Sequence, residues 1–262
     1  MDLNLKGKKA FVCGSTQGIG RATAEELAAL GADVTLCARN EESLEAVKSN
    51  LTVEDGQSHQ ILVADFSKPD LLKQCVTDHL GQGNAYHILI NNTGGPPGGQ
   101  AIEAGIDEFR IAFNQHLVCN QILAQAITPA MKSAGYGRIV NIISTSVKIP
   151  LNGLGVSNTI RGAVANWSKT LANELGQFGI TVNNVLPGAT ATQRLSSIIE
   201  NKANKTGKSV AEVEQAMKAS VPANRFAEAY EVAAAAAFLC TPAASYINGV
   251  NLPVDGGRTG SL

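Results

Sequence analysis

The 262-residue sequence is poor in charged and aromatic residues, and neither sign of charge predominates. Charged residues make up 16% of the chain and aromatic residues 5%, and the formal net charge is −1. Proteins that bind nucleic acids or anionic membrane surfaces usually carry a clear positive excess, so we expect neither partner. No run of about 18 apolar residues occurs, and the first six residues lack the apolar core of a signal peptide, so neither a membrane span nor a leader is predicted.

Cysteine and histidine occur in spacings that predict neither disulfides nor a metal site. The five cysteines are odd in number and scattered, and no C-x-x-C motif occurs. We interpret them as reduced core thiols of a cytoplasmic protein. The four histidines form no H-x-x-x-H pair, so no metal is predicted. These residues are Cys13, Cys37, Cys75, Cys119, Cys240, His59, His79, His87 and His116.

Strand-like and helix-like patterns alternate along the chain, which is typical of a doubly wound parallel sheet. Apolar residues make up 44% of the sequence, enough for a full core. We predict an α/β Rossmann fold of about seven strands, with residues 1–262 forming one domain. The polar stretch 189–222 is the one segment that resembles an insertion, and we predict that it closes over the substrate as a lid. The expected strands are 10–13, 34–38, 60–64, 88–90, 138–143, 180–186 and 250–254, and the longer helices are 21–30, 107–132, 156–178 and 228–239.

A glycine-rich turn lies between the first strand and the first helix. It reads Gly14-Ser15-Thr16-Gln17-Gly18-Ile19-Gly20. Glycine is needed at such a turn because a Cβ atom would block it or hold a phosphate away from the backbone. The unpaired N–H groups at the helix start and the positive end of the helix dipole both attract an anion. The turn therefore predicts a binding site for the pyrophosphate of a dinucleotide.

The end of the second strand indicates which dinucleotide is bound. Dinucleotide folds select NAD with an acidic residue about 20 residues after the glycine turn. The corresponding stretch, Cys37-Ala38-Arg39-Asn40, has no acid. Arg39 can instead form a forked contact with a 2′-phosphate, which favours NADP(H) over NAD(H). Asp65, after the third strand, either binds the adenine amino group or caps the next helix.

Four motifs in order resemble the short-chain dehydrogenase/reductase superfamily, and most of all its 3-oxoacyl-ACP reductase-like members. They are Gly14-x-x-x-Gly18-x-Gly20, Asn91-Asn92-Thr93-Gly94, Val182-Asn183-Asn184-Val185-Leu186-Pro187-Gly188 and Val254-Asp255-Gly256-Gly257. The resemblance implies that Asn91 holds the central sheet and the adenosine side, and that Thr93 and Gly94 also bind the cofactor. It further implies that Pro187, Gly188 and Thr192 hold the nicotinamide amide. Members of this superfamily are commonly homodimers or homotetramers that act on small molecules.

The catalytic set of that superfamily is an asparagine, a serine and a Tyr-x-x-x-Lys pair, and only the serine is matched here. Ser144 follows the fifth strand, and the tyrosine position thirteen residues later is Ser157. The lysine position is Arg161, and the asparagine position is His116. None of the four tyrosines has a lysine four residues later, so the pair is absent under any alignment.

These replacements change the proton chemistry that the resemblance implies. A serine hydroxyl is far less acidic than a phenol, and a guanidinium does not give up its proton near neutral pH. Arg161 can still bind the nicotinamide ribose, and Ser144 can donate a hydrogen bond to the substrate oxygen. His116 has an ordinary pKa of about 6.5, suited to proton donation near neutrality, or it is simply satisfied in a polar core.

Several residues around the expected active site have more than one possible role. The loop Gly94-Gly95-Pro96-Pro97-Gly98-Gly99 either walls the substrate site or is an ordinary rigid turn. Lys148 can approach the substrate or remain solvated. Around the polar segment, only Arg194 and Arg225 offer charged anchors for a substrate.

Three functions remain in competition at the level of sequence. The first is an NADP(H)-dependent oxidoreductase that transfers hydride between nicotinamide and a carbonyl or alcohol with an unusual proton donor. The second is a silent or regulatory protein that binds NADP(H) without turnover. A serine hydrolase is the third, but no G-x-S-x-G elbow occurs. The first is favoured because positions 157 and 161 keep a hydroxyl and a cation on one face of a helix.

Overall fold

The computed structural model describes residues 1–54 and 56–261 and contains one seven-stranded sheet. Its strands are all parallel and lie in the order β3-β2-β1-β4-β5-β6-β7. Strands β2 and β3 are added on one side of β1, and β4 to β7 are added on the other side. The boundary between β1 and β4 is therefore a topological switch point, which is where open α/β sheets bind ligands. The strands are β1 Lys9–Cys13, β2 Asp33–Ala38, β3 Gln60–Val63, β4 Ile88–Asn91, β5 Gly137–Ile142, β6 Ile180–Pro187 and β7 Asn251–Val254.

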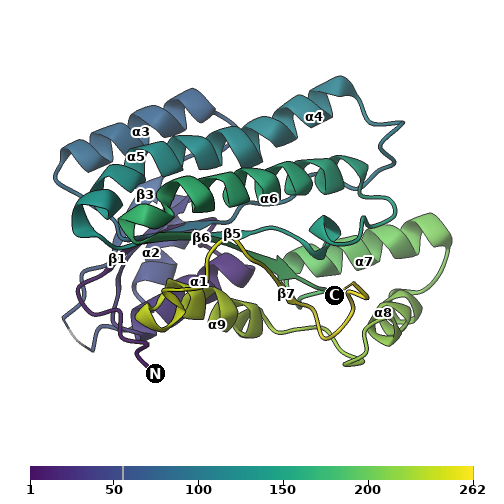
Figure 1. Ribbon diagram of the computed structural model, residues 1–262. Coiled ribbons are helices and arrows are strands. Elements are labelled where there is room, and N and C mark those ends of the chain that lie inside the picture. The colour runs from purple at the N-terminus through teal and green to yellow at the C-terminus, as the bar shows by residue number, and fades with distance from the viewer. Residues whose placement is uncertain (55, 262) are drawn as a thin grey trace.

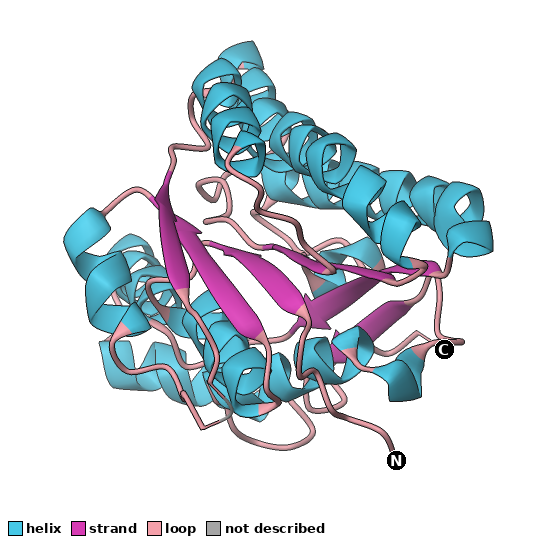
Figure 2. Cartoon of the chain, turned by 90° about the vertical axis from the view of Figure 1, so that its left-hand side faces the viewer, coloured by secondary structure: helices cyan, strands magenta, loops and turns pink. Residues whose placement is uncertain are grey.

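Helices cover both faces of this sheet, as Figures 1 and 2 show. One face packs against α1, α2 and α9, and the other packs against α3, α5 and α6. The central strands are buried from both sides and therefore read as continuous apolar runs, as parallel strands do. The predicted doubly wound α/β fold is confirmed. The α-helices are α1 Gly18–Ala29, α2 Glu41–Lys48, α3 Pro69–Gly81, α4 Ile106–Phe113, α5 Cys119–Ala134, α6 Gly155–Leu175, α7 Gln193–Thr206, α8 Val210–Ala219 and α9 Ala229–Cys240.

A row of asparagines links four neighbouring strands inside the sheet. Asn91 donates to the Oδ1 atom of Asn141, Asn141 to that of Asn184, and Asn184 to that of Asn251, over 2.8, 2.9 and 2.8 Å. Each pair also occupies matching register positions on adjacent strands. Buried amides need such partners, because an unpaired amide in the core costs stability. The row therefore fixes the register of the strands from β4 to β7.

The expected single helix over 107–132 is divided. A π-helical turn, Asn114–Val118, separates α4 from α5 and contains His116. A π turn adds a residue to the helical repeat and often occurs at functional sites. The sequence did not predict this turn, because no residue type indicates a π turn and the apolar spacing on either side is that of an α-helix.

Element ends also shift by a residue or two. The fifth strand ends at Ile142 rather than at residue 143, so Ser144 is two residues beyond it. There Ser144 caps a short 3-10 helix, Thr145–Val147, by accepting a hydrogen bond from the Ser146 amide over 3.1 Å.

The polar stretch 189–222 folds as α7 and α8 beside one end of the sheet (Figure 1). Four buried side chains, Leu195, Ile199, Ala203 and Val213, hold the two helices together in a small cluster of their own. Ser209 and Glu212 form a capping box at the start of α8. In the described part of the chain, no helix is both long and apolar enough to cross a membrane.

Candidate active site

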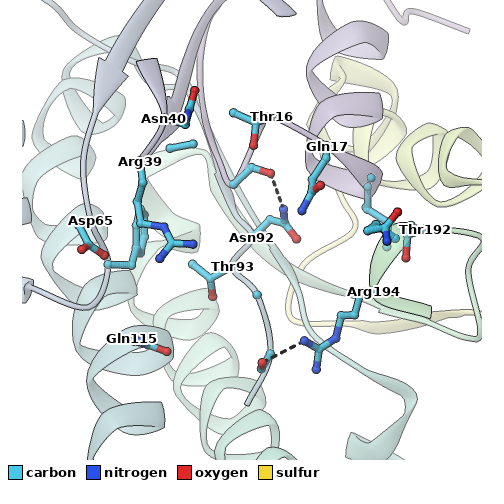
Figure 3. A pocket seen from close by; sticks show the side chains of 18 of the residues that line it. Thr16, Gln17, Arg39, Asn40, Asp65, Asn92, Thr93, Gln115, Thr192 and Arg194 are labelled. Carbon is cyan, nitrogen blue, oxygen red and sulfur yellow. Dashed lines mark hydrogen bonds between the residues drawn. The ribbon is translucent and has the colours of Figure 1, made fainter. Parts of the chain in front are cut away.

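A cleft of about 530 Å³ opens at the carboxyl ends of β1, β2, β3 and β4 (Figure 3). The glycine turn, the residues after β2 and β3, the start of the loop after β4, and the segment leading into α7 all line it. Ten residues predicted to bind a dinucleotide belong to this lining: Gly14, Thr16, Gln17, Gly18, Ile19, Arg39, Asp65, Thr93, Gly94 and Thr192.

The glycine turn needs glycine for steric reasons at two positions. Gly14 has a φ of +59°, and a Cβ there would lie 2.5 Å from the carbonyl oxygen of Asn92. A Cβ at Gly20 would overlap the carbonyl oxygen of Gly14. Helix α1 then begins without a side-chain cap and without an acidic residue in its first turn. Its first N–H groups are therefore free of a competing carboxylate beside the cleft.

Asn92, rather than Asn91, lies on the cleft wall. The Asn92 side chain donates to the carbonyl oxygens of Cys13 and Gly14 and so ties the loop after β4 to the glycine turn (Figure 3). Asn91 is 3% exposed and points into the asparagine row. The prediction that Asn91 holds the sheet fits this geometry, but its assignment to the adenosine side needs correction, because successive side chains of a strand face opposite ways.

Other predicted binding residues lie behind the lining. Ser15 is fully buried, and its hydroxyl oxygen has no hydrogen-bond partner among the described residues. Gly188 donates its amide to Val254, and a Cβ there would lie 2.7 Å from the Cα of Asp255. Neither Gly20, Pro187 nor Gly188 is part of the cleft lining.

Arg39 and Asp65 face each other across the far end of the cleft, where β2 and β3 end (Figure 3). The Asp65 carboxylate accepts the Ser67 amide over 2.9 Å, and this bond, helped by the charge of Arg39, lowers the pKa of Asp65. Asp65 is thus a charged turn residue at the cleft and does not cap the next helix, because α3 begins at Pro69 with Lys68 as its N-cap. Arg39 is exposed and free to turn toward a ligand.

His116 is buried next to two arginines. Its Nδ1 atom is 2.7 Å from the hydroxyl of Thr93, and its buried Nε2 atom has no partner in the described structure. Burial, with the charges of Arg161 and Arg194, lowers the pKa of His116 to about 3. The expectation of proton donation near neutrality needs correction, because the environment keeps this imidazole neutral at pH 7.

Two of the three replaced catalytic residues, Ser157 and Arg161, lie on one buried stretch of α6. Ser157 is 9% exposed and Arg161 is 7% exposed. The single hydrogen bond of Arg161 within the described chain goes to the carbonyl oxygen of Ile142, over 3.4 Å. Burial and the charge of Arg194 lower its pKa to about 10, so the guanidinium remains protonated near neutral pH. Ser144 lies at the end of β5, half-buried, with its oxygen oriented by the Ser146 amide.

Sequence reasoning placed Arg194 near the substrate but did not foresee what holds it. Its guanidinium donates to the carbonyl oxygens of Gly95 and Pro96 over 3.0 and 3.2 Å, which joins the start of α7 to the loop after β4 (Figure 3). Thr192 caps α7 with its hydroxyl on the Leu195 amide. The other end of the loop pairs with Leu154 through Gly99, so this loop is a braced wall of the cleft.

The remaining candidates lie elsewhere. Lys148 is exposed at the end of the short 3-10 helix. Arg225 forms a two-pronged ion pair with Glu231 at the surface, over 2.6 and 2.7 Å. Gln115, from the π turn, lines the cleft without having been singled out. Across residues 1–54 and 56–261, no group of three or more metal-binding side chains comes together.

The cleft residues fit a dinucleotide phosphate. The glycine turn leaves room for backbone contact, the uncapped start of α1 offers N–H groups, and Arg39 supplies a cation at the adenosine end. The buried and unpartnered hydroxyl of Ser15 belongs to the same turn.

Comparison with known proteins gives matches over the whole length. The family model for enoyl-(acyl carrier protein) reductase matches residues 14–259. A tropinone reductase homologue of Arabidopsis thaliana is 34% identical over 260 residues, covering 98% of this chain and 94% of that protein. The 3-oxoacyl-[acyl-carrier-protein] reductase of Vibrio harveyi is 31% identical over 257 residues, covering 97% and 98%.

Solved structures agree with these matches. The crystal structure of L-sorbose reductase from Gluconobacter frateurii, complexed with NADPH and L-sorbose, aligns with a TM-score of 0.92 and 28% identity over 100% of both chains. The crystal structure of YwfH, an NADPH-dependent reductase involved in bacilysin biosynthesis, gives a TM-score of 0.91 at 30% identity over 97% of this chain and 99% of that one. The chain therefore belongs to the short-chain dehydrogenase/reductase superfamily, in the family described as enoyl-(acyl carrier protein) reductase.

Proposed function

We propose that the protein is an NADP(H)-dependent oxidoreductase that interconverts a carbonyl compound and its alcohol. The observation that carries this proposal is the single cleft that brings together the glycine turn, Arg39 and Thr93 at the switch point of the sheet. Relatives and structural neighbours named as NADPH-dependent reductases add support. When bound, the nicotinamide would supply or accept the hydride.

The chain's own residues divide the binding work along the cleft. We assign the pyrophosphate to the amides of the glycine turn and the start of α1. Arg39 would pair with the 2′-phosphate, and Asp65 would accept the adenine amino group. At the other end, Thr192 would meet the nicotinamide amide, with Gly188 behind it in the same segment, and Arg161 would meet the ribose.

We further propose that the proton reaches the product oxygen through hydroxyl groups rather than from a phenol. Ser144 would donate a hydrogen bond to the substrate oxygen, and Ser157 stands where the superfamily has its tyrosine. A serine hydroxyl both accepts and donates, so Ser157 can relay a proton although it is too weak an acid to be its source. His116, neutral and bonded to Thr93, would orient groups in the site rather than supply the proton.

A silent NADP(H)-binding protein is the second candidate function. It is favoured by one observation: neither His116 nor Arg161, which occupy two of the superfamily's catalytic positions, changes charge near neutral pH. The pKa of His116 is about 3 and that of Arg161 about 10, so neither exchanges a proton readily at pH 7.

One pair of measurements separates the two candidates. NADPH is titrated into the protein by calorimetry, and its oxidation is then followed by absorbance with a panel of ketones, aldehydes and 3-oxoacyl thioesters. Binding with turnover supports the oxidoreductase, and binding with no turnover on any substrate supports the silent protein. Absence of binding by both NADPH and NADH removes both. Ser144→Ala should lower any turnover while leaving the dissociation constant of NADPH unchanged.

We also propose that α7 and α8 form a lid over the substrate.

We further propose that the protein is a homodimer or homotetramer. A shallow hollow between α4 and α6, lined in part by Phe109, Phe113 and Ile160, exposes apolar surface on that face and supports an assembly. Analytical ultracentrifugation tests the assembly, and a single monomeric species at micromolar concentration contradicts it.

A further inference from the structure

Two guanidinium groups meet at one glycine in the cleft. An added Cβ at Gly95 would lie 2.8 Å from the Nη2 atom of Arg194 and 3.4 Å from the Nη2 atom of Arg161. The two cations come from different elements, α6 and the start of α7, and converge only in the folded chain. Glycine at position 95 leaves the space that both groups use.

This pair of cations is not neutralised within the described chain. No ion pair to Arg161 or Arg194 occurs there, and the charges acting on Arg161 include that of Arg194 but no carboxylate. The hydrogen-bond acceptors of both groups are backbone carbonyl oxygens: Ile142 for Arg161, and Gly95 and Pro96 for Arg194. Two like charges, one of them 7% exposed, are costly to hold together without an anion.

The neighbouring groups do not compensate either. Burial first, and then the charges of both arginines, lowers the pKa of His116 and keeps it neutral, and its Nε2 atom has no partner among the described residues. Helix α7 begins at Gln193 without an acidic residue in its first turn, so its positive end adds to the same field. A guanidinium is shaped to bind a carboxylate through two parallel hydrogen bonds, and both groups retain unused N–H donors.

The position of the pair favours the substrate over the cofactor phosphates. Figure 3 shows Arg194 near the loop after β4, away from Thr16 and from Arg39, which mark the phosphate-binding parts of the cleft. Arg161 follows Ser157 by one helical turn, so the cations lie beside the position assigned to the reacting carbonyl.

We propose that Arg161 and Arg194 bind the carboxylate of the substrate, Arg161 through N–H donors that its contact with the ribose leaves free, and that the protein therefore acts on an oxo acid whose carboxylate lies close to the reacting carbonyl. This inference rests on the proposed reductase function for its catalytic meaning, but the anion subsite can be tested separately. A neutral ketone of the same shape would leave both cations unpaired and should bind less tightly, by about 10- to 100-fold for a charge-assisted contact.

The test compares oxamate, a stable analogue of a 2-oxo acid, with the neutral oxamide by calorimetric titration, both with saturating NADP⁺ and without cofactor. We expect oxamate to bind at least about 10-fold more tightly than oxamide. The difference should disappear in Arg194→Gln and shrink in Gly95→Ala, which keeps both charges but displaces them. Arg110→Gln, which removes an equally charged group that is 73% exposed on α4, serves as the control and should retain it.

The outcomes separate the two proposals. If NADP⁺ and NADPH do not bind, the oxidoreductase proposal fails, and the cofactor-free titration still decides the anion subsite. Equal binding of oxamate and oxamide, or no binding of oxamate in either arm, overturns the carboxylate subsite. It is also overturned if Arg194→Gln weakens NADPH binding as much as oxamate binding, because Arg194 would then serve the cofactor phosphates. Circular dichroism confirms that each variant is folded.

Discussion

Replacing Arg39 with glutamine should weaken the binding of NADPH and leave that of NADH unchanged. Arg39 follows β2 directly and lines the cleft where the adenosine end of a dinucleotide is expected. Asp65, which lines the same end of the cleft, accepts the Ser67 amide, and no ion pair between Asp65 and Arg39 occurs among the described residues. The guanidinium is therefore available to a 2′-phosphate, which NADPH carries and NADH lacks.

The size of the effect follows from the exposure of this side chain. A hydrogen bond to a charged group contributes about 1.5 to 3 kcal/mol, and exposure to solvent places Arg39 toward the lower end of that range. A loss of about 1 to 2 kcal/mol corresponds to a dissociation constant for NADPH that rises by about 5- to 30-fold. The dissociation constant for NADH should change by less than about 2-fold, because no phosphate contact is lost.

Calorimetric titration of both cofactors at low and high salt measures this difference directly. Arg21→Gln is the matched control, because Arg21 is also an exposed arginine, on α1, and is paired with Glu25 rather than with the cleft. The NADPH effect of Arg39→Gln should shrink as salt screens the charges. An equal loss for NADPH and NADH, or no loss for either, would refute the assignment of Arg39 to the 2′-phosphate.

Three further predictions concern stability and chemistry. Because burial lowers the pKa of His116 to about 3, the unfolded chain binds a proton between pH 6.5 and 3 that the folded chain does not. The free energy of unfolding should therefore fall as the pH decreases through this window, and it should fall more steeply in the parent than in His116→Asn, by up to about 1.4 kcal/mol per pH unit. Chemical denaturation at several pH values measures this difference. A Cβ at Gly137 would lie 2.8 Å from side-chain atoms of Ile180 and Met131 in the core, so Gly137→Ala should destabilise the folded protein by about 1 to 3 kcal/mol. Gly81 has open space around it, so Gly81→Ala should not destabilise the protein. Equal melting temperatures of the two variants would contradict the packing argument. The double variant Ser157→Tyr, Arg161→Lys should oxidise NADPH with a neutral ketone at least about 10-fold faster than the parent, because a positioned acid contributes about 100-fold or more to the rate. An unchanged rate would place the proton donor elsewhere.

The fold could be predicted because the sequence carries its periodicity locally. Buried strands such as Val34–Ala38 and Ile88–Ile90 are short apolar runs, and the helices between them start at residues such as Pro69 that suit a first turn. Element ends were less accurate, as at Ile142, because strand ends depend on pairing with neighbours.

The site could be predicted where a local motif or a position just after a strand indicates a residue's role. Most of the glycine turn lines the cleft, as do Arg39 after β2 and Asp65 after β3. The convergence of Arg161 and Arg194 at Gly95 involves three segments, and the sequence does not contain the distances between them. The acidity of His116 was also misjudged, because an ordinary pKa describes a solvated imidazole and this one is buried beside two cations.

The replacements at 116, 157 and 161 depend on one another through charge. Arg161 cannot be neutralised at pH 7, and Arg194 adds a second cation, so a protonated imidazole at position 116 would place a third positive charge in the same buried space. Histidine is tolerated there because it can remain neutral, with its Nδ1 atom paired to Thr93. The same field would lower the pKa of any acid placed at position 157, and would stabilise negative charge on a substrate oxygen. In the proposed reduction of a carbonyl, such a site would depend less on a strong acid, because its cations would stabilise the alkoxide before the proton arrives.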